Sequence, residues 1–371
     1  MKFTINKRDV LDVLSKVQGL TGRKTNLAIT ANVLIQTRDS GILISATDLE
    51  TGFEGFFAAT IETEGVIAIN ARKFYEIVRD FPNSDIMIHE KENRWIEIKN
   101  NTVEYHIVGM SSDDFPDIPV FDDVEFFDIE SAVLKKMFEK TLLSTVTDDS
   151  RAHVIGVYME RITKDGAGVF RIVSTDGNRL TLVDHVFEAD IRMPDGPGVI
   201  VPKKGVQEVH KFLDSEGTVR IGFKHNHFIL KKESETISIR LLEGDFPEYS
   251  AIVVKRDGNV ISINRQMFLM MLKRMSILAS DTYKGVIFNF RENSLEITSI
   301  NPELGESKED MAIEFSGEPI EVAFNPKYFI DTLNVIDSEN VIVTIIDAEK
   351  PCVIEEEKNN HYLSIIMPMR I

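Results

Sequence analysis

Three pairs of adjacent aspartates are the residues of this sequence whose type could support metal-ion chemistry: Asp113-Asp114, Asp122-Asp123 and Asp148-Asp149. A two-metal nuclease or phosphoesterase needs carboxylates that converge on one point and clamp the attacking and leaving oxygens. Adjacent residues of an extended chain point to opposite sides, so each pair is a poor ligand set for one ion. The pattern favours solvated loops, and a metal-dependent hydrolase remains only an alternative.

Other catalytic patterns are absent from the sequence. The eight histidines are scattered, His225 and His227 form the only close pair, and no HExxH spacing occurs. There is no GxxxxGK[ST] or GxGxxG phosphate loop, and Asp165-Gly166 is typical of a hairpin turn. The single cysteine, Cys352, excludes an internal disulfide framework and favours a reducing compartment. We therefore expect no enzyme activity, no catalytic residue, no metal and no cofactor.

A short strand followed by an amphipathic helix recurs three times along the chain. The clearest copy is FDIESAVLKKMFEKTLL, residues 127–143, where apolar side chains follow helical spacing. Helices of this type begin near residues 7, 131 and 264, which are separated by 124 and 133 residues. A second helix type begins near residues 71, 202 and 325, at separations of 131 and 123 residues. Two matching periods predict three domains.

The strands around these helices alternate apolar and polar residues in short runs. Each domain therefore reads as a βαβββ unit that occurs twice, which gives an α+β fold. Aspartate-phenylalanine-proline tripeptides close the first two domains, at 114–116 and 245–247. We predict domains at 1–124, 125–251 and 252–371. Asn6, Asn70, Asn264 and Asn325 are expected to cap four of the six main helices.

Charge is divided unevenly between the helices and the rest of the chain. The predicted helices are 7–18, 71–80, 131–143, 202–214, 264–279 and 325–335. They contain 16 of the 42 Lys and Arg residues but only 8 of the 60 Asp and Glu residues. The remaining chain holds 26 basic and 52 acidic residues. A shared basic helix surface would suit a phosphate backbone without reading its sequence, although the total charge of −18 opposes polyanion binding elsewhere.

Three stretches resemble one family closely: the start MKFTINKRDVL, the segment TDGNRL at 175–180 and the end MPMRI at 367–371. The chain is similar, over its full length, to the bacterial sliding clamp, the beta subunit of DNA polymerase III. The resemblance implies three clamp-type domains per chain, with two helices on one face of the sheets in each. It also implies a head-to-tail homodimeric ring that encircles double-stranded DNA and confers processivity on the replicative polymerase.

The resemblance also implies partners and sites. Short peptide motifs of the polymerase and of clamp-loader subunits are expected to bind in a cleft. The expected cleft residues are Val154, Thr175, Gly177, Asn178, Arg179, Leu180, Pro247, Ile252, Ile366, Met367, Pro368, Met369 and Arg370. The expected DNA-binding residues are Arg23, Lys24, Arg72, Lys136, Lys140, Arg151, Lys203 and Lys204. Among them, Lys136 and Lys140 are assigned by helical spacing, because they fall on the face opposite the apolar stripe of the helix at 131–143. Asp148, Ala152 and His153 stand where well-known members have Gln and two Tyr.

For the dimer interface, an edge strand of the first domain should continue the sheet of the third domain in the partner, which would cover an unpaired strand edge. The expected interface residues are Lys73, Tyr105, Ile107, Ile277, Leu278, Glu303, Glu306 and Glu309. The start of the chain lacks a signal-peptide pattern and no stretch is apolar enough to span a membrane, so we expect a cytoplasmic protein without a membrane partner. Besides the hydrolase, a repeat scaffold that binds only proteins stays open.

Overall fold

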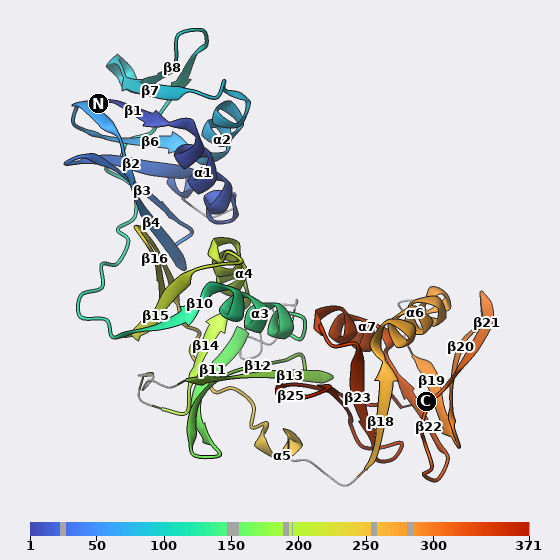
Figure 1. Ribbon diagram of the computed structural model, residues 1–371. Coiled ribbons are helices and arrows are strands. Elements are labelled where there is room, and N and C mark those ends of the chain that lie inside the picture. The colour runs from blue at the N-terminus through green and yellow to red at the C-terminus, as the bar shows by residue number, and fades with distance from the viewer. Residues whose placement is uncertain are drawn as a thin grey trace. The chain divides into compact units, whose positions relative to one another are not determined.

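The computed structural model describes residues 1–22, 27–146, 156–187, 193–194, 196–253, 258–279 and 285–370. The chain divides into two compact units. Unit 1 comprises Met1–Lys135, Arg192–Asp195 and Lys204–Leu241, and unit 2 comprises Lys136–Ile191, Gly196–Lys203 and Leu242–Ile371. Each unit contains two antiparallel sheets with helices packed beside them (Figure 1).

The βαβββ motif occurs six times, as predicted. The first copy is β1 (Lys2–Asn6), α1 (Lys7–Thr21), β2 (Asn32–Arg38), β3 (Gly41–Thr47) and β4 (Thr51–Ala58). The second is β6 (Val66–Asn70), α2 (Ala71–Asp80), β7 (Asp85–Glu90), β8 (Trp95–Lys99) and β9 (Glu104–Val108), preceded by the short β5 (Thr60–Thr63). The third is β10 (Phe126–Glu130), α3 (Ser131–Leu142), β11 (Gly156–Lys164), β12 (Ala167–Thr175) and β13 (Arg179–Phe187).

The other three copies follow the same order. The fourth is β14 (Val199–Pro202), α4 (Lys203–Phe212), β15 (Thr218–Lys224), β16 (His227–Lys232) and β17 (Glu235–Arg240). The fifth is β18 (Asn259–Asn264), α6 (Arg265–Met275), β19 (Val286–Arg291), β20 (Ser294–Asn301) and β21 (Gly305–Ala312). The sixth is β22 (Ile320–Phe324), α7 (Pro326–Val335), β23 (Asn340–Ile345), β24 (Cys352–Glu356) and β25 (Asn359–Ile366). The one-turn helix α5 (Ser250–Val253) was not predicted.

The sheets cross the expected domain boundaries. Unit 1 holds the sheets β5-β1-β7-β8-β9 and β10-β15-β16-β17-β4-β3-β2-β6, and unit 2 holds β14-β11-β12-β13-β25-β24-β23-β18 and β21-β20-β19-β22. In unit 1, β17 pairs with β4, with Ile237 opposite Phe53. In unit 2, β13 pairs with β25, with Leu182 opposite Leu363. Consecutive domains therefore share eight-stranded sheets.

Helix starts and buried stripes follow the sequence pattern. The side chains of Asn6, Asn70, Asn264 and Asn325 each accept a hydrogen bond from a backbone N–H of the first helical turn, which confirms the predicted caps. Apolar residues at helical spacing are buried, for example Val10, Leu14 and Val17 of α1 and Phe268, Met271 and Leu272 of α6. Cys352 is also buried, and burial raises the pKa of its thiol.

Candidate functional site

A cleft of about 280 Å³ in unit 2 brings together the TDGNRL segment, the chain after Asp245 and the end of β25. The lining residues are Thr175, Gly177, Arg179, Leu180, Pro247, Glu248, Tyr249, Ile252, Ile365 and Met367. Seven of them were predicted from the sequence, although they come from three segments far apart in the chain. The lining combines apolar side chains such as Leu180, Ile252 and Ile365 with the polar Thr175, Arg179 and Glu248.

The tight turn between β12 and β13 fixes one wall of the cleft. The carboxylate of Asp176 accepts hydrogen bonds from the backbone N–H groups of Asn178 and Arg179, both at 3.0 Å. The hydroxyl of Thr175 donates to the carbonyl of Arg179 at 2.7 Å and accepts from the N–H of Gly177 at 3.1 Å. Gly177 has φ +87°, a conformation that favours glycine. The turn is therefore held by its own side chains.

Arg179 is buried, and its guanidinium joins several segments of unit 2. It contacts the carboxylate of Asp176 at 3.1 Å and that of Asp331 on α7 at 2.8 Å, and it donates to the carbonyl of Leu143. It also lies 4.4 Å from the ring centre of Tyr328. A buried, fully bonded arginine stiffens the cleft wall.

The opposite wall is the segment that follows β17, which packs on the sheet through aromatic rings. The rings of Tyr158 and Phe246 stack at 4.7 Å between centroids, and Tyr249 meets Tyr158 edge-on at 6.5 Å. The hydroxyl of Tyr249 donates a hydrogen bond to the carboxylate of Glu160. Burial raises the pKa of Glu160, and burial raises the pKa of Tyr158 to about 12. These residues hold α5 and Ile252 beside the cleft.

The C-terminal segment forms the third side. β25 ends at Ile366, and the N–H of Met367 donates to the carbonyl of Asn178 at 2.9 Å. The N–H of Met369 donates to the carbonyl of Ala323 at 2.8 Å. The chain leaves the strand after Ile366, and Pro368 has no N–H with which to continue a ladder.

The prediction for Ile366 was wrong. Its side chain is fully buried on the opposite face of β25, and Ile365 lines the cleft instead, because successive strand residues point to opposite faces. Asn178, Pro368, Met369 and Arg370 lie close to lining residues in the chain and stay predictions, and Val154 lies outside the described residues. Glu248, Tyr249 and Ile365 were missed. The alternation along β25 could have found Ile365, but no sequence signal distinguished Tyr249.

The predicted DNA-binding residues divide into exposed and internally paired side chains. Arg72 is 80% exposed and forms an ion pair with Glu76 of its own helix, and Lys204 is exposed. Lys136 is exposed but paired with Asp337, and Lys203 is partly buried with its amine 3.3 Å from the carbonyl of Thr145. Burial lowers the pKa of Lys203, and the charge of Arg179 lowers it further. Arg23, Lys24 and Arg151, like Asp148, Ala152 and His153, lie outside the described residues.

The prediction for Lys140 was wrong. Its side chain is buried, its amine forms an ion pair with the buried carboxylate of Glu356, and it lies 5.0 Å from the ring centre of Tyr362. Because its amine is paired with a carboxylate inside the fold, Lys140 offers little surface and no free charge to a phosphate.

The predicted interface residues lie on two strands at sheet edges, on the 3-10 turn Ser276–Leu278, on α2 (Lys73) and in the loop between β20 and β21 (Glu303). β9, with Tyr105 and Ile107, is the edge strand of one sheet in unit 1, and β21, with Glu306 and Glu309, is the edge strand of one sheet in unit 2. Ile277 is 74% exposed, and Leu278 is half-buried. Lys73 pairs with Glu76 at 2.8 Å, and Glu309 pairs with Arg274. Glu303 is exposed.

The described aspartate pairs do not form a metal site. Asp113, Asp114, Asp122 and Asp123 are exposed, and Asp148-Asp149 lies outside the described residues. Across the described chain, the group of ligand-type side chains close enough to share an ion is Glu97, Glu104 and His106, within 4.8 Å of one another. The amine of Lys99 already lies 2.9 Å from Glu97 in this group. No helix in the described ranges has the length and apolarity that a membrane span requires.

Comparisons with known proteins agree along the whole chain. Family models of the DNA polymerase III beta subunit match residues 1–119 (N-terminal domain), 128–248 (central domain) and 252–370 (C-terminal domain). The beta sliding clamp of Vibrio cholerae is 30% identical over 375 residues, covering 100% of both chains. The structure of the DNA polymerase III subunit beta of Pseudomonas aeruginosa has a TM-score of 0.92 at 28% identity, again covering 100% of both chains. A sliding clamp of Bartonella birtlesii, bound to griselimycin, has a TM-score of 0.93 at 27% identity and the same coverage.

Proposed function

Since this chain belongs to the DNA polymerase III beta subunit family, the bacterial sliding clamps, we propose that its unit 2 cleft is where partner peptides dock. The protein is a DNA sliding clamp that tethers the replicative polymerase to DNA, and it is not an enzyme. Its partners are double-stranded DNA, the polymerase and the clamp loader, the proteins binding through short peptide motifs.

The observation that carries the cleft proposal is its combination of fixed walls, one held by the contacts of Arg179 and one by packed aromatic rings, with an apolar base and a methionine at the rim. Leu180 and Ile365 are buried at the base, whereas Met367 remains 40% exposed at the rim. Methionine adapts to different shapes, which suits a site that receives several leucine- or phenylalanine-bearing peptides. Arg179, whose guanidinium is already bonded within the fold, fixes the turn that forms the polar end of the cleft.

For the DNA contacts, we propose Arg72 and Lys204, whose side chains are exposed. Lys136 and Lys203 would attract DNA more weakly, because Lys136 pairs with Asp337 and the amine of Lys203 contacts the carbonyl of Thr145. Arg23, Lys24 and Arg151 stay in the proposed set on sequence grounds. Contacts with the phosphate backbone alone would leave the clamp free to move along DNA, because they carry no sequence information.

For the assembly, we propose a head-to-tail dimeric ring of chains with domains 1–124, 125–251 and 252–371, located in the cytoplasm. The edge strand β9 of one copy would pair with β21 of the partner, with Ile277 and Leu278 packed against Tyr105 and Ile107. Lys73 would then face Glu303, Glu306 or Glu309. Pairing two unpaired edge strands satisfies their backbone groups and leaves no exposed template for aggregation.

A titration tests the cleft. A short synthetic peptide with leucine and phenylalanine anchors should bind the wild type, and Leu180→Ala and Met367→Ala should each weaken binding by about tenfold, or about 1.4 kcal/mol. Ile300→Ala, an exposed apolar residue outside the cleft, is the matched control and should bind like wild type. Equal affinity in all four proteins would show that the peptide binds elsewhere. Retention on nicked circular DNA, and loss after linearisation, tests encirclement independently.

A further inference from the structure

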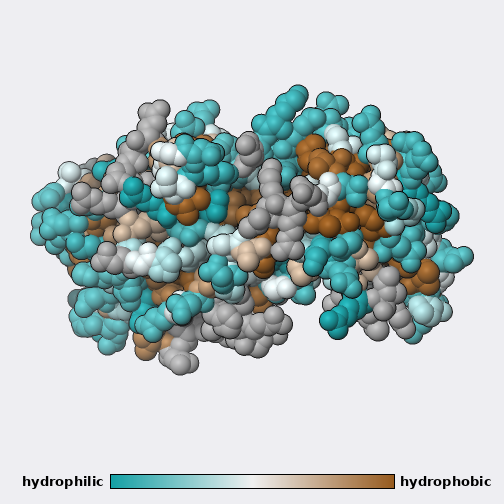
Figure 2. Space-filling view, turned by 90° about the horizontal axis from the view of Figure 1, so that it is seen from below, coloured by the Kyte–Doolittle hydropathy of each residue, from teal (hydrophilic) through white to brown (hydrophobic). Residues whose placement is uncertain are grey.

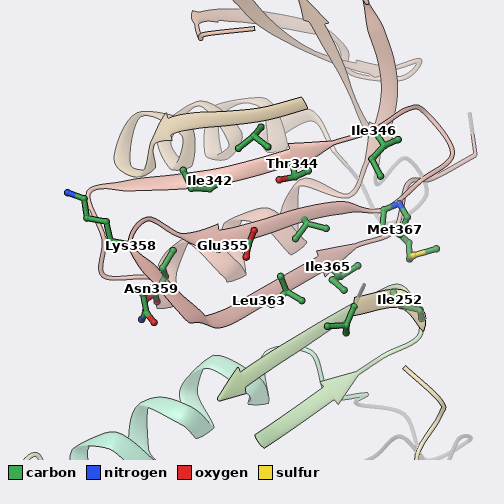
Figure 3. Close-up of a pocket in the computed structure, with 15 residues that line it drawn as sticks. Ile252, Ile342, Thr344, Ile346, Glu355, Lys358, Asn359, Leu363, Ile365 and Met367 are labelled. Carbon is green, nitrogen blue, oxygen red and sulfur yellow. The ribbon is translucent and has the colours of Figure 1, made fainter. Parts of the chain in front are cut away.

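One face of the sheet β18-β23-β24-β25 in unit 2 is largely apolar, with Glu355 among its side chains, and within the described part of the chain the one-turn helix α5 is the helix that borders it. Ser364 of β25 contacts Thr332 of α7 at 2.9 Å, so this side of the strand faces the helices. Leu363 and Ile365 consequently point the other way, as do Ile342 and Thr344, which alternate with the buried Val341 and Val343. Figure 3 shows these side chains rising from β23, β24 and β25 into one hollow.

The strand register aligns these side chains in two rows. Val260 lies opposite Thr344, Thr344 opposite Val353, and Val353 opposite Ile365. In the second row, Ile342 lies opposite Glu355, and Glu355 opposite Leu363. We call the hollow lined by Val260, Ile342, Thr344, Val353, Leu363 and Ile365 the extended groove. Its volume is about 500 Å³.

The fold itself does not require this face to be apolar. The four strands β10-β15-β16-β17 of unit 1 occupy the same place in the βαβββ repeat as β18-β23-β24-β25. There, one cross-strand row reads Asp128, Arg220, Lys231 and Thr236, all outside the core. Counted back from the helix that follows the first strand, this row matches Ser262, Ile342, Glu355 and Leu363 of unit 2, so the three charged side chains of unit 1 are replaced there by one. The neighbouring row of Val260, Thr344, Val353 and Ile365 matches Phe126, Gly222, Ile229 and Ser238, which carry no charge. Large exposed apolar patches that are surrounded by polar residues usually mark binding surfaces.

The extended groove continues directly into the peptide cleft. Ile252, Ile365 and Met367 line both hollows. In Figure 3, Ile252 and Met367 lie at one end of the groove, where the cleft begins, and Lys358 and Asn359 lie at the other end. The segment after β17 covers the sheet over Leu180 and Leu182 and leaves the area over Val353 and Leu363 only partly covered. Figure 2 shows hydrophobic residues in several patches on this side of the molecule, with hydrophilic residues between them.

We propose that the extended groove binds a second, apolar segment of the replicative polymerase, alongside the peptide anchored in the cleft. The inference rests on the proposed function of the cleft. Once the anchor is bound, a linked segment meets the groove at a high effective concentration, so even a weak apolar contact multiplies the total affinity. Such a contact lowers the dissociation rate, which benefits the polymerase that must stay on the clamp rather than the loader that must leave.

The test places charge in the groove without touching the cleft. Val260→Glu changes a side chain that is 65% exposed, and Val260→Glu with Thr344→Glu charges two facing positions. Val186→Glu makes the same change at a 45% exposed position of the same sheet outside the groove. Each protein is titrated with the full-length polymerase and with the short leucine and phenylalanine anchor peptide, after thermal unfolding has shown that the variants are folded.

The double variant should bind the polymerase about tenfold more weakly or worse, the single variant less so, and Val186→Glu like wild type. All should bind the anchor peptide as wild type does. Unchanged polymerase affinity would overturn the proposal, as would equal weakening for the anchor peptide or a loss confined to the clamp loader. A change in sedimentation would assign the groove to a second copy of the chain instead. If Leu180→Ala leaves the affinity for the anchor peptide unchanged, the cleft proposal has failed, which is a separate result.

Discussion

The guanidinium of Arg179 joins three segments of unit 2 that are far apart in the sequence: its own turn, the end of α3 and α7. A buried cation with several charged and carbonyl partners leaves uncompensated groups behind when it is removed. We predict that Arg179→Met lowers the free energy of unfolding by about 3 kcal/mol. It should also weaken peptide binding, because the turn that forms one cleft wall loses its anchor.

Arg179→Lys should give an intermediate loss of stability, since a lysine keeps the charge but lacks the planar fork that reaches Asp176 and Asp331 together. Denaturant unfolding and peptide titration measure the two effects. A variant with wild-type stability but weakened peptide binding would show that Arg179 contacts the peptide itself and does not act by holding the turn in place.

His227 makes part of unit 1 sensitive to pH. Its ring lies 5.0 Å from that of Phe121, and burial lowers its pKa, with Arg240 and His225 lowering it further. A histidine whose pKa is depressed in the folded state contributes stability above its unfolded pKa of about 6.5 and loses it as pH falls through the folded pKa. The unfolding free energy of the wild type should therefore fall more between pH 7 and about 5 than that of His227→Phe.

Thermal or denaturant unfolding of both proteins across this range measures the difference, and His361→Phe, an exposed histidine, is the control. Parallel pH profiles for wild type and His227→Phe would mean that the ring is solvated in both states.

Among the secondary-structure elements, α3 shows what sequence periodicity could not predict. Its buried stripe of Leu134, Met137 and Phe138 was predicted correctly from helical spacing. Lys140 was assigned to the basic face by the same spacing, but its partner Glu356 lies on β24, 216 residues further along the chain. Periodicity predicts which side of a helix is apolar. It cannot predict which distant strand packs near the other side.

The same limit explains the other misses. The six βαβββ copies, the caps and the turn at Asp165-Gly166, where both residues have positive φ, follow from local pattern. The pairing of β17 with β4 and of β13 with β25 could not be predicted, because it depends on which strand edges lie next to each other in the folded chain. Within the cleft, the family resemblance identified the segments, but the choice between Ile365 and Ile366 depends on the register of β25.

The pair of Lys140 and Glu356 gives a prediction at this scale. Lys140→Ala leaves a buried carboxylate without its cation, so we expect the free energy of unfolding to fall by about 3–5 kcal/mol. Replacing both partners, as Lys140→Met with Glu356→Leu, should recover most of this loss because no charge remains buried. Denaturant unfolding measures both variants. If Lys140→Ala were as stable as wild type, the ammonium would be solvated and Lys140 would return to the set of DNA contacts.

At the scale of the whole molecule, the concentration of basic residues on the helices should make the affinity for DNA depend on the salt concentration. Each phosphate contact that is removed should lower the slope of log affinity against log salt by about 0.9. We expect Arg72→Gln with Lys204→Gln to reduce this slope and to shorten retention on nicked circular DNA at low salt. Lys350→Gln, an exposed lysine on a loop, is the control. An unchanged slope would show that these two side chains do not face DNA.

The proposed interface predicts that the ring depends on a few exposed apolar side chains. Ile277 is 74% exposed in the single chain, so its truncation should barely change the free energy of unfolding of the monomer. If Ile277 is buried against a partner, the same truncation should weaken dimerisation. Truncating a buried isoleucine or leucine to alanine costs about 2–5 kcal/mol each. Ile277→Ala with Leu278→Ala should therefore convert the dimer to a folded monomer at micromolar concentration, as measured by sedimentation.

Leu49→Ala, 52% exposed and far from either edge strand in sequence, should remain a dimer. If the double variant also sediments as a dimer, the interface lies on another surface, and the pairing of β9 with β21 must be given up.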